Sequence, residues 1–212
     1  MEELYKKVTE IFSKRHHIAH DIKHITRTAA LARYIAGQEG YDEDEAEVAG
    51  ILHDMGRTVQ DEDKGHGPAG VPLARQLLDE YTNYDETAKT RILSAVECHS
   101  YLNAIGELTH IVQDADMLDG LGAIGMMRAY TSKANSVDYN SDDIVPSVGK
   151  QNATINDQIV YQMEWFGLMH TKTAKKIATN RHDFMVEFFK EFNNEALGLD
   201  YKRKTPQLRG AH

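Results

Sequence analysis

The sequence predicts an all-α domain, and three observations support this prediction. Only four of the 212 residues are proline, so long helices can run without interruption. Apolar residues recur at three- and four-residue steps, which is the spacing of one helical face. No segment shows the sustained alternation of apolar and polar residues that indicates a half-buried strand.

The composition excludes several classes of protein. Lys and Arg total 24 and Asp and Glu total 33, which gives a formal net charge of −9. This balance argues against a nucleic-acid partner, which requires a basic face. The one cysteine, Cys98, excludes an intrachain disulfide and a Cys-rich zinc site. The N-terminal segment is amphipathic and charged, and no apolar run is long enough for a membrane span. We therefore expect a cytoplasmic protein with no membrane partner.

Two helices are expected before residue 41. The first has one apolar face, formed by Leu4, Val8, Ile11 and Phe12. The second has a face of Ile25, Ala29, Ala32 and Ala36. Gly37 and Gly40 predict the end of this second helix, because glycine commonly follows a helix C-terminus.

The third helix carries the clearest start signal in the chain. Asp42 is suited to the N-cap, and Glu45 stands three residues later, as in a capping box. The apolar run that follows leads directly to His53 and Asp54, and Gly56 is expected to stop the helix.

The rest of the chain is predicted as one polar loop, helices, one long break and a tail. The loop covers residues 58–70, and helices are expected over about 71–81, 85–99, 111–118 and 126–134. The break covers 136–152, as a lid or a surface loop, and two closing helices follow over 156–169 and 173–196. We expect one domain over residues 1–196 and a C-terminal tail over 197–212.

A particular order of histidine and aspartate residues indicates a metal site. His24 is followed by the pair His53-Asp54 and then by Asp116, each in or beside an apolar helical stretch. These side chains could therefore converge inside a helical bundle. Two imidazoles and two carboxylates would leave a six-coordinate ion with positions for water and substrate.

The segments around these residues resemble a known family. They read HDIKHITR, AGILHDMG and QDADMLDGLGAIGMMR, and the last helix reads TAKKIATNRHDFMVEFF. The sequence resembles the HD-domain superfamily of metal-dependent phosphohydrolases, and in particular the small single-domain bacterial members, from about His20 to Phe192. The resemblance implies a metal-binding core at about 20–130, inside the bundle, with closing helices at about 152–196. It implies that the metal ligands are His24, His53, Asp54 and Asp116.

Further roles follow from this resemblance. Asp54 would be a catalytic inner ligand and could bridge two ions. Asp119 would either orient a ligand histidine or cap a helix. In binuclear members two further histidines lie between the His-Asp pair and the last Asp, and His66 and His99 occupy that interval here. They would bind a second ion or act as general acid and phosphate binder; otherwise His66 lies in a surface loop and His99 caps a helix.

Arginines are expected to bind the phosphates of an anionic substrate. Arg27, one helical turn from His24, and Arg128 are the candidates, because a guanidinium binds phosphate with two parallel hydrogen bonds. A basic run opens the last helix and is expected to be a solvated face from which one residue could reach the site: Lys172, Lys175, Lys176 and Arg181.

The expected activity is hydrolysis of a nucleotide, such as a nucleoside triphosphate, with Mn²⁺, Mg²⁺, Co²⁺, Fe²⁺ or Ni²⁺. Alarmone hydrolases and 5′-nucleotidases of the superfamily place an acidic residue three positions after the aspartate of the pair. Arg57 stands there, which argues against alarmone hydrolysis. The alternatives are a di-iron oxygenase and a non-catalytic nucleotide-binding module.

The Phe-rich last helix, which includes Phe184, Phe188, Phe189 and Phe192, would either belong to the core or pair two copies as a homodimer.

Overall fold

The structure is a computed structural model that describes residues 1–14, 20–60, 64–132 and 155–202. All the secondary structure in these ranges is helical, so the predicted all-α fold is confirmed. The helices are α1 (Glu2–Ser13), α2 (Ile22–Glu39), α3 (Glu43–Leu52), η1 (Met55–Thr58), α4 (His66–Tyr81) and α5 (Glu86–Cys98). They continue with α6 (Glu107–Asp119), α7 (Gly122–Ser132), α8 (Ile155–Glu164), η2 (Trp165–Leu168), α9 (Lys172–Ala196) and α10 (Leu199–Lys202).

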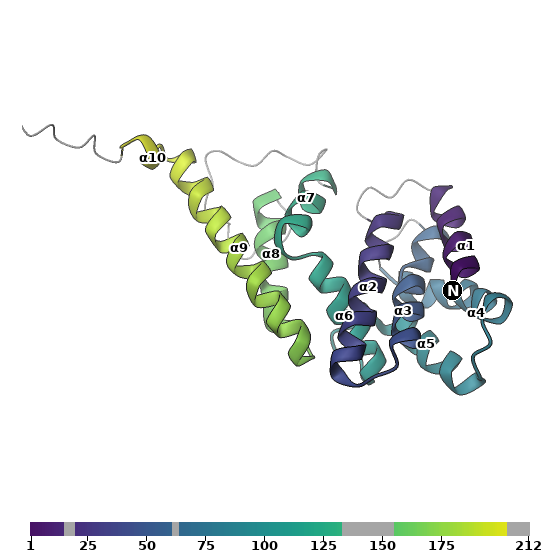
Figure 1. The fold of residues 1–212 in the computed structure, drawn as a ribbon. Helices are drawn as coiled ribbons and strands as arrows, with labels where there is room; N and C mark the ends of the chain where they lie inside the picture. Colours follow the sequence, from purple (N-terminus) through teal and green to yellow (C-terminus); the bar gives the residue numbers. More distant parts are fainter. Residues whose placement is uncertain (15–19, 61–63, 133–154, 203–212) are drawn as a thin grey trace, which may run out of the picture.

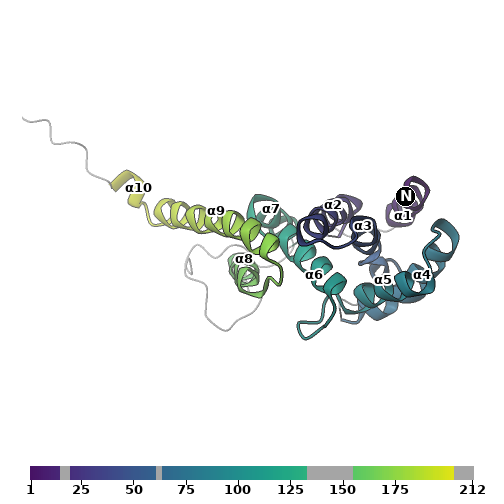
Figure 2. The ribbon, with the colours of Figure 1, turned by 60° about the horizontal axis from the view of Figure 1, so that its bottom comes forward.

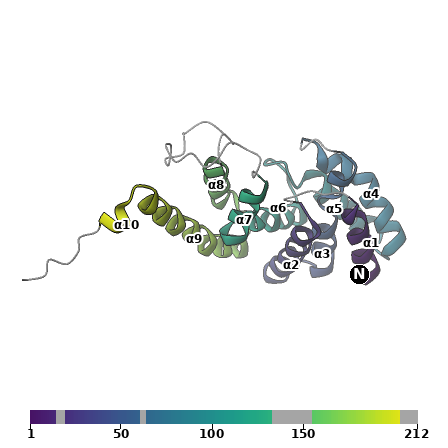
Figure 3. The same ribbon diagram turned by 90° about the horizontal axis from the view of Figure 1, so that it is seen from above.

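Helix α6 is the central element of the arrangement (Figure 1). Helices α1 to α5 gather on one side of it, and α7, α8 and α9 lie on the other side, as Figures 2 and 3 also show. Helix α6 packs against α2, α3 and α5 in the first group and against α7 and α9 in the second. The C-terminal part of α9 extends away from the bundle (Figure 2).

Small residues allow α2 and α3 to approach closely. A Cβ atom on Gly50 would lie 2.8 Å from the Cα atom of Ala29, so glycine is required at this contact. The expected apolar face of α2 is buried, and that of α1 is buried except for the half-buried Ile11. This contact matters for the site because α2 carries His24 and α3 leads into His53.

Several predicted helix ends are confirmed, with two exceptions. Asp42 caps α3 by accepting hydrogen bonds from the backbone N–H groups of Asp44 and Glu45, but the Glu45 carboxylate binds Arg91 on α5 and so links two helices. Gly40 ends α2 at φ 78°, whereas Gly37 lies inside that helix.

The predicted loop over 58–70 is wrong for its second half, because α4 begins at His66. The predicted stop at Gly56 is also wrong, since α3 ends at Leu52 and Gly56 lies inside η1. The reason is close backbone packing. A Cβ on Gly56 would lie 1.7 Å from the carbonyl oxygen of His66, and one on Gly67 would lie 2.3 Å from that of Glu97. These glycines let η1, α4 and α5 touch, and they do not indicate a loop.

The remaining differences are smaller. Helices α6 and α7 each begin about four residues earlier than predicted. The predicted break over 136–152 lies outside the described residues. The tail contains one short helix, α10, and the division into a domain and a tail stays a prediction. Within the described part of the chain, no helix has the length and apolar character needed to cross a bilayer.

The Phe-rich face of α9 is not part of the buried core. Phe184 is 48% exposed, and Phe188, Phe189 and Phe192 are half-buried and contact one another. The buried residues of α9 are Ala174, Ala178 and Met185. The prediction that this face belongs to the core is wrong for Phe184, whereas Phe188 and Phe189 pack against the edge of the core. Pairing of two copies through this face stays a prediction.

We predict that Gly56→Ala lowers the free energy of unfolding by about 3 kcal/mol or more, because the new methyl group would overlap the backbone of α4. The matched control is Gly37→Ala, whose methyl group meets only the flexible end of Glu43; it should change stability by less than about 1 kcal/mol. Urea denaturation of both variants and of the wild-type protein measures these changes in the free energy of unfolding. Equal stabilities would contradict the close contact between η1 and α4.

Candidate metal centre

Four side-chain donor atoms from three segments converge inside the bundle. His24 lies in the first turn of α2, His53 and Asp54 follow α3, and Asp116 lies in the last turn of α6. The Nε2 atom of His24 is 3.2 Å from Nε2 of His53 and 3.3 Å from Oδ1 of Asp116. Oδ2 of Asp54 is 3.6 Å from both Nε2 atoms. The structure therefore brings together the four residues that the sequence predicted as ligands.

Hydrogen bonds determine which ring nitrogens face this point. Nδ1 of His24 is 2.8 Å from a carboxylate oxygen of Asp119, and Nδ1 of His53 is 2.8 Å from the carbonyl oxygen of Gly50. Because these partners are acceptors, both Nδ1 atoms carry a proton and donate it. In the neutral rings both Nε2 lone pairs then face each other, which is unfavourable without a proton or a cation between them.

The donor spacing fits a divalent cation. Nitrogen and oxygen ligands about 2.0–2.2 Å from one ion lie roughly 3.0–3.5 Å apart at octahedral or tetrahedral angles. The observed separations run from 3.2 Å between the two imidazoles to 3.9 Å between His53 and Asp116. The set of two nitrogens and two oxygens is one that several divalent metals accept.

The electrostatics of the cluster also favour a cation. Burial alone would lower the pKa of His24, but hydrogen bonds to Asp119 and Asp54 raise it to about 9. Burial lowers the pKa of His53 to about 4. Burial opposes ionisation of Asp54 and Asp116, yet the neighbouring histidines hold the pKa of both carboxyls below their usual range. The metal-free cluster thus holds a proton at His24, which a metal ion would displace.

His20 is a residue of the cluster that the sequence-based prediction missed. Its Nδ1 atom is 2.7 Å from Oδ2 of Asp54, and its ring contacts the ring of His24 edge-on. The four-residue spacing between His20 and His24 is not a reliable signal, because Asp21 caps α2 and the helix begins only at Ile22, so His20 lies outside the helix that carries His24.

Asp119 holds three side chains and thereby orients His24. Besides the His24 ring, it binds Arg27 through both oxygens, at 2.6 and 2.9 Å, and Arg128 at 3.0 Å. Of the two roles expected for Asp119, the structure shows contact with a ligand histidine. Phosphate binding by Arg27 and Arg128 stays a prediction, because the structure shows both guanidinium groups on Asp119.

A second group of nitrogen atoms surrounds Oδ1, the other carboxylate oxygen of Asp54. The Nε2 atoms of His66 and His99 are 2.8 Å apart and lie 3.3 and 3.6 Å from Oδ1 of Asp54. Nε of Arg57 donates to the same oxygen at 2.8 Å. His66, placed by the sequence in a loop, is the first residue of α4 and is 5% exposed.

The basic run at the start of α9 divides into two parts. Lys172, Lys175 and Lys176 are exposed, as expected of a solvated face. The guanidinium of Arg181 instead donates to the carbonyl oxygen of Leu118 at the end of α6. Burial lowers the pKa of Arg181. This arginine joins α9 to the helix that carries Asp116.

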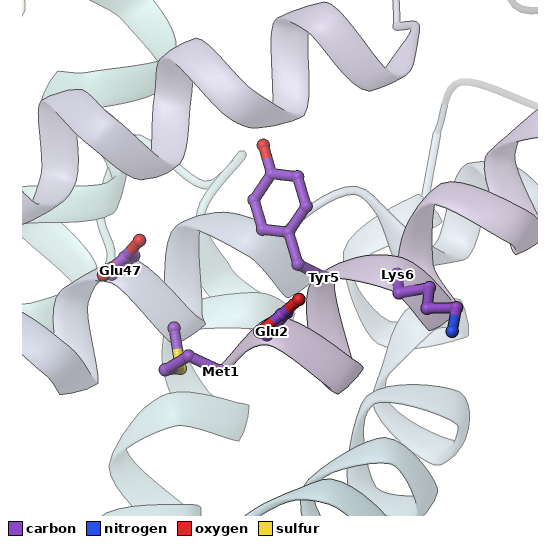
Figure 4. Close-up of a pocket in the computed structure, with 5 residues that line it drawn as sticks. All are labelled: Met1, Glu2, Tyr5, Lys6 and Glu47. Atoms are coloured by element: carbon purple, nitrogen blue, oxygen red, sulfur yellow. The ribbon is translucent and has the colours of Figure 1, made fainter.

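A pocket of about 730 Å³ opens over the metal cluster. Its polar end includes His20, Arg57, His66, His99, Asp116 and Arg128. Another wall comes from α8 and η2 and includes Gln158, Tyr161, Gln162 and Trp165. An open hollow of about 500 Å³ near the N-terminus is different, because Tyr5, Lys6 and Glu47 point in different directions there and form no convergent set of donors (Figure 4).

Comparison with known proteins agrees with this geometry. The family model described as HD domain matches residues 21–121. This chain contains an HD domain. The matched segment contains the four converging residues together with Asp119, His66 and His99. Helices α7 and α8 and the short helix η2 follow the matched segment and contribute further residues to the pocket.

Relatives of this HD-domain protein are bacterial. Protein YpgQ of Bacillus subtilis is 25% identical over 195 residues, which cover 85% of this chain and 86% of YpgQ. A deoxyguanosinetriphosphate triphosphohydrolase-like protein of Pelagibacter ubique is 26% identical over 165 residues, but the chain spans only 42% of that protein.

Solved structures share the fold. An HD-superfamily hydrolase from Bacillus thuringiensis superposes with a TM-score of 0.72 at 26% identity, over 92% of this chain and 95% of that one. A predicted HD-superfamily hydrolase from an uncultured Thermotogales bacterium superposes with a TM-score of 0.68 at 26% identity, over 92% of each chain. The structure of Bacillus subtilis YpgQ in complex with ADP superposes with a TM-score of 0.68 at 19% identity, over 99% of this chain and 96% of that one. At this identity the likeness shows the fold alone. The chain therefore shares its fold with HD-superfamily hydrolases.

We predict that Asp119→Asn weakens the affinity for a divalent metal about 10- to 100-fold, because the His24 ring loses its anionic hydrogen-bond partner. Asp183→Asn is the matched control, since Asp183 is exposed on α9. Titration against a metal-sensitive fluorescent chelator measures both affinities. Circular dichroism checks that the helices persist. An Asp119→Asn protein with wild-type affinity would show that Asp119 does not position a ligand.

Proposed function

We propose that this protein is a metal-dependent phosphohydrolase that acts on a nucleotide. The observation that carries the proposal is the convergence of the His24, His53, Asp54 and Asp116 donor atoms at one end of a 730 Å³ pocket. A second support comes from a relative, because the structure of YpgQ is a complex with ADP. The pocket volume lies within the range usual for small-molecule sites.

The four converging residues would hold the ion, whose identity among Mn²⁺, Mg²⁺, Co²⁺, Fe²⁺ and Ni²⁺ is left open by a mixed set of nitrogen and oxygen donors. When bound there, a divalent ion supplies an acidified water and polarises a phosphoryl oxygen. The Nδ1 hydrogen bonds to Asp119 and Gly50 orient the two imidazoles for this task before the ion arrives.

Arg57 and Arg128 would neutralise the phosphate groups at the polar end of the pocket. Arg57 binds Asp54, Arg128 binds Asp119, and both arginines line the pocket. A guanidinium has five N–H donors, so each arginine can bind a carboxylate and a phosphate oxygen together. This would explain how a chain with a net charge of −9 binds a polyanion.

His66 and His99 would protonate the leaving oxygen. Their Nε2 atoms lie 2.8 Å apart, so one proton is shared between two nitrogens. Burial would lower the pKa of His99, but its hydrogen bond to Asp54 raises it. A histidine with a raised pKa keeps its proton to a higher pH than a free imidazole, which suits it to general-acid catalysis.

The same geometry disfavours the two alternatives. A di-iron oxygenase would need a second ion on His66, His99 and Oδ1 of Asp54, and Arg57 already donates to that oxygen. A cationic guanidinium beside this position repels a second ion. A non-catalytic binding module would not need a complete set of four donors. We therefore propose one ion per chain.

The proposal is tested by a screen of phosphate and pyrophosphate release from (d)NTPs, (d)NDPs and (d)NMPs with each metal, together with metal analysis. We expect the wild-type protein to retain one ion and to hydrolyse a subset of these nucleotides. Asp54→Ala should lose metal retention and at least about 100-fold of the turnover while keeping its helicity, because it removes a ligand. Asp183→Ala, on the exposed face of α9, is the control and should behave as wild type.

Two results would contradict the proposal. The first is an Asp54→Ala protein that stays metal-replete and active. The second is a metal-replete wild-type protein that releases neither phosphate nor pyrophosphate from any nucleotide. Two irons per chain without such release would instead support the oxygenase.

A further inference from the structure

Helix α8 contributes a polar and aromatic wall to the pocket. Gln158, Tyr161, Gln162 and Trp165 are spaced by three or four residues, so they share one helical face, and all four line the pocket. We refer to these four residues as the α8 wall. The roles proposed above for the polar end of the pocket use none of them.

Gln162 is the informative residue of the α8 wall. It is 7% exposed, and its Oε1 atom has no hydrogen-bond donor among the described residues. Proteins rarely leave a buried carbonyl oxygen without a donor. Oε1 itself has almost no accessible surface in this structure, but Gln162 lines the pocket. Rotation of its carboxamide would turn this acceptor towards an N–H or O–H group of a ligand.

The same pocket contains a second acceptor of this kind. Gln113 on α6 is 4% exposed, and its Nε2 atom donates to the carbonyl oxygens of Tyr101 and Cys98, at 2.7 and 3.3 Å. These two acceptors determine the orientation of the amide and leave Oε1 without a donor among the described residues. Gln113 precedes Asp116 by three residues, so both lie on the same side of α6.

The α8 wall is attached to the metal end of the pocket through Trp165. A Cβ atom on Gly120 would lie 2.3 Å from Cζ3 of Trp165, so the indole packs directly on the backbone beside Asp119. The Tyr161 ring meets the Trp165 ring edge-on, with centroids 5.9 Å apart. Aromatic rings held in this way provide flat apolar surface beside the carboxamide of Gln162.

The chemistry of the two ends is complementary. The four residues of the α8 wall are uncharged, whereas Arg57 and Arg128 also line the pocket and carry the positive charge that phosphates require. We propose that the α8 wall binds the nucleoside part of the substrate and that Oε1 of Gln162 accepts an N–H group of the base. This inference rests on the proposed function and adds the substrate feature that the pocket selects: a nucleobase with an N–H donor.

The test removes the donor from the substrate and the acceptor from the protein. ATP is compared with purine riboside triphosphate, which lacks the 6-amino group, and CTP with its 2-pyrimidinone analogue, which lacks the 4-amino group. The wild-type protein should prefer the amino-bearing member of at least one pair by about 10-fold or more in kcat/KM, because the analogue leaves a buried acceptor unpaired. Gln162→Met, of similar length but without the acceptor, should reduce this preference to less than about 2-fold.

Two further measurements make the test specific. Gln76→Met on the exposed surface of α4 is the matched control and should keep the wild-type preference. Binding of the nucleosides themselves, adenosine against purine riboside and cytidine against its 2-pyrimidinone analogue, is measured by NMR titration. This readout requires neither hydrolysis nor a bound ion, and it should show the same preference and its loss in Gln162→Met.

The outcomes separate this inference from the proposed function. Hydrolysis of nucleotides with no preference in either pair, or a preference that survives in Gln162→Met, would overturn the inference and leave the proposed function in place. Discrimination between nucleosides without any nucleotide hydrolysis would support the inference and contradict the proposed activity. Neither hydrolysis nor nucleoside binding would overturn both.

Discussion

The structure depends most on two imidazole nitrogens that face each other at 3.2 Å beside two carboxylates. This arrangement is unfavourable on its own and becomes favourable when a cation lies among the four groups. The fold produces it by bringing α2 and α3 into backbone contact at Gly50 and by placing Asp119 behind His24. The packing of small residues and the chemistry of the site are therefore two consequences of one helix–helix contact.

The carboxylates of Asp54 and Asp119 hold the histidines and arginines of the site in place. Each carboxylate binds histidine with one or both oxygens and also binds at least one arginine. Two of these arginines, Arg57 and Arg128, line the pocket. Helices α7 and α8 contribute to the pocket from outside the matched HD segment. In the function that we propose, the HD segment would carry the reaction and the helices that follow it would select the substrate.

Local patterns in the sequence predicted what depends on local chemistry. Apolar periodicity predicted the helices, Asp42 predicted the start of α3, and the order of His24, His53, Asp54 and Asp116 predicted their convergence. Contacts between distant backbone segments were not predictable, because the local pattern predicts a helix stop at Gly56 and a loop at Gly67. Both glycines instead allow η1, α4 and α5 to touch. The roles of His20 and of the α8 wall depend on tertiary placement and have no local signature.

The central claim is that one divalent ion is held by four particular atoms. A crystal of the protein loaded with Mn²⁺, measured with anomalous scattering, tests this most directly. We predict one anomalous peak per chain, about 2.0–2.2 Å from Nε2 of His24, Nε2 of His53, Oδ2 of Asp54 and Oδ1 of Asp116. A peak between His66 and His99, or no peak within reach of His24 and His53, would contradict the account.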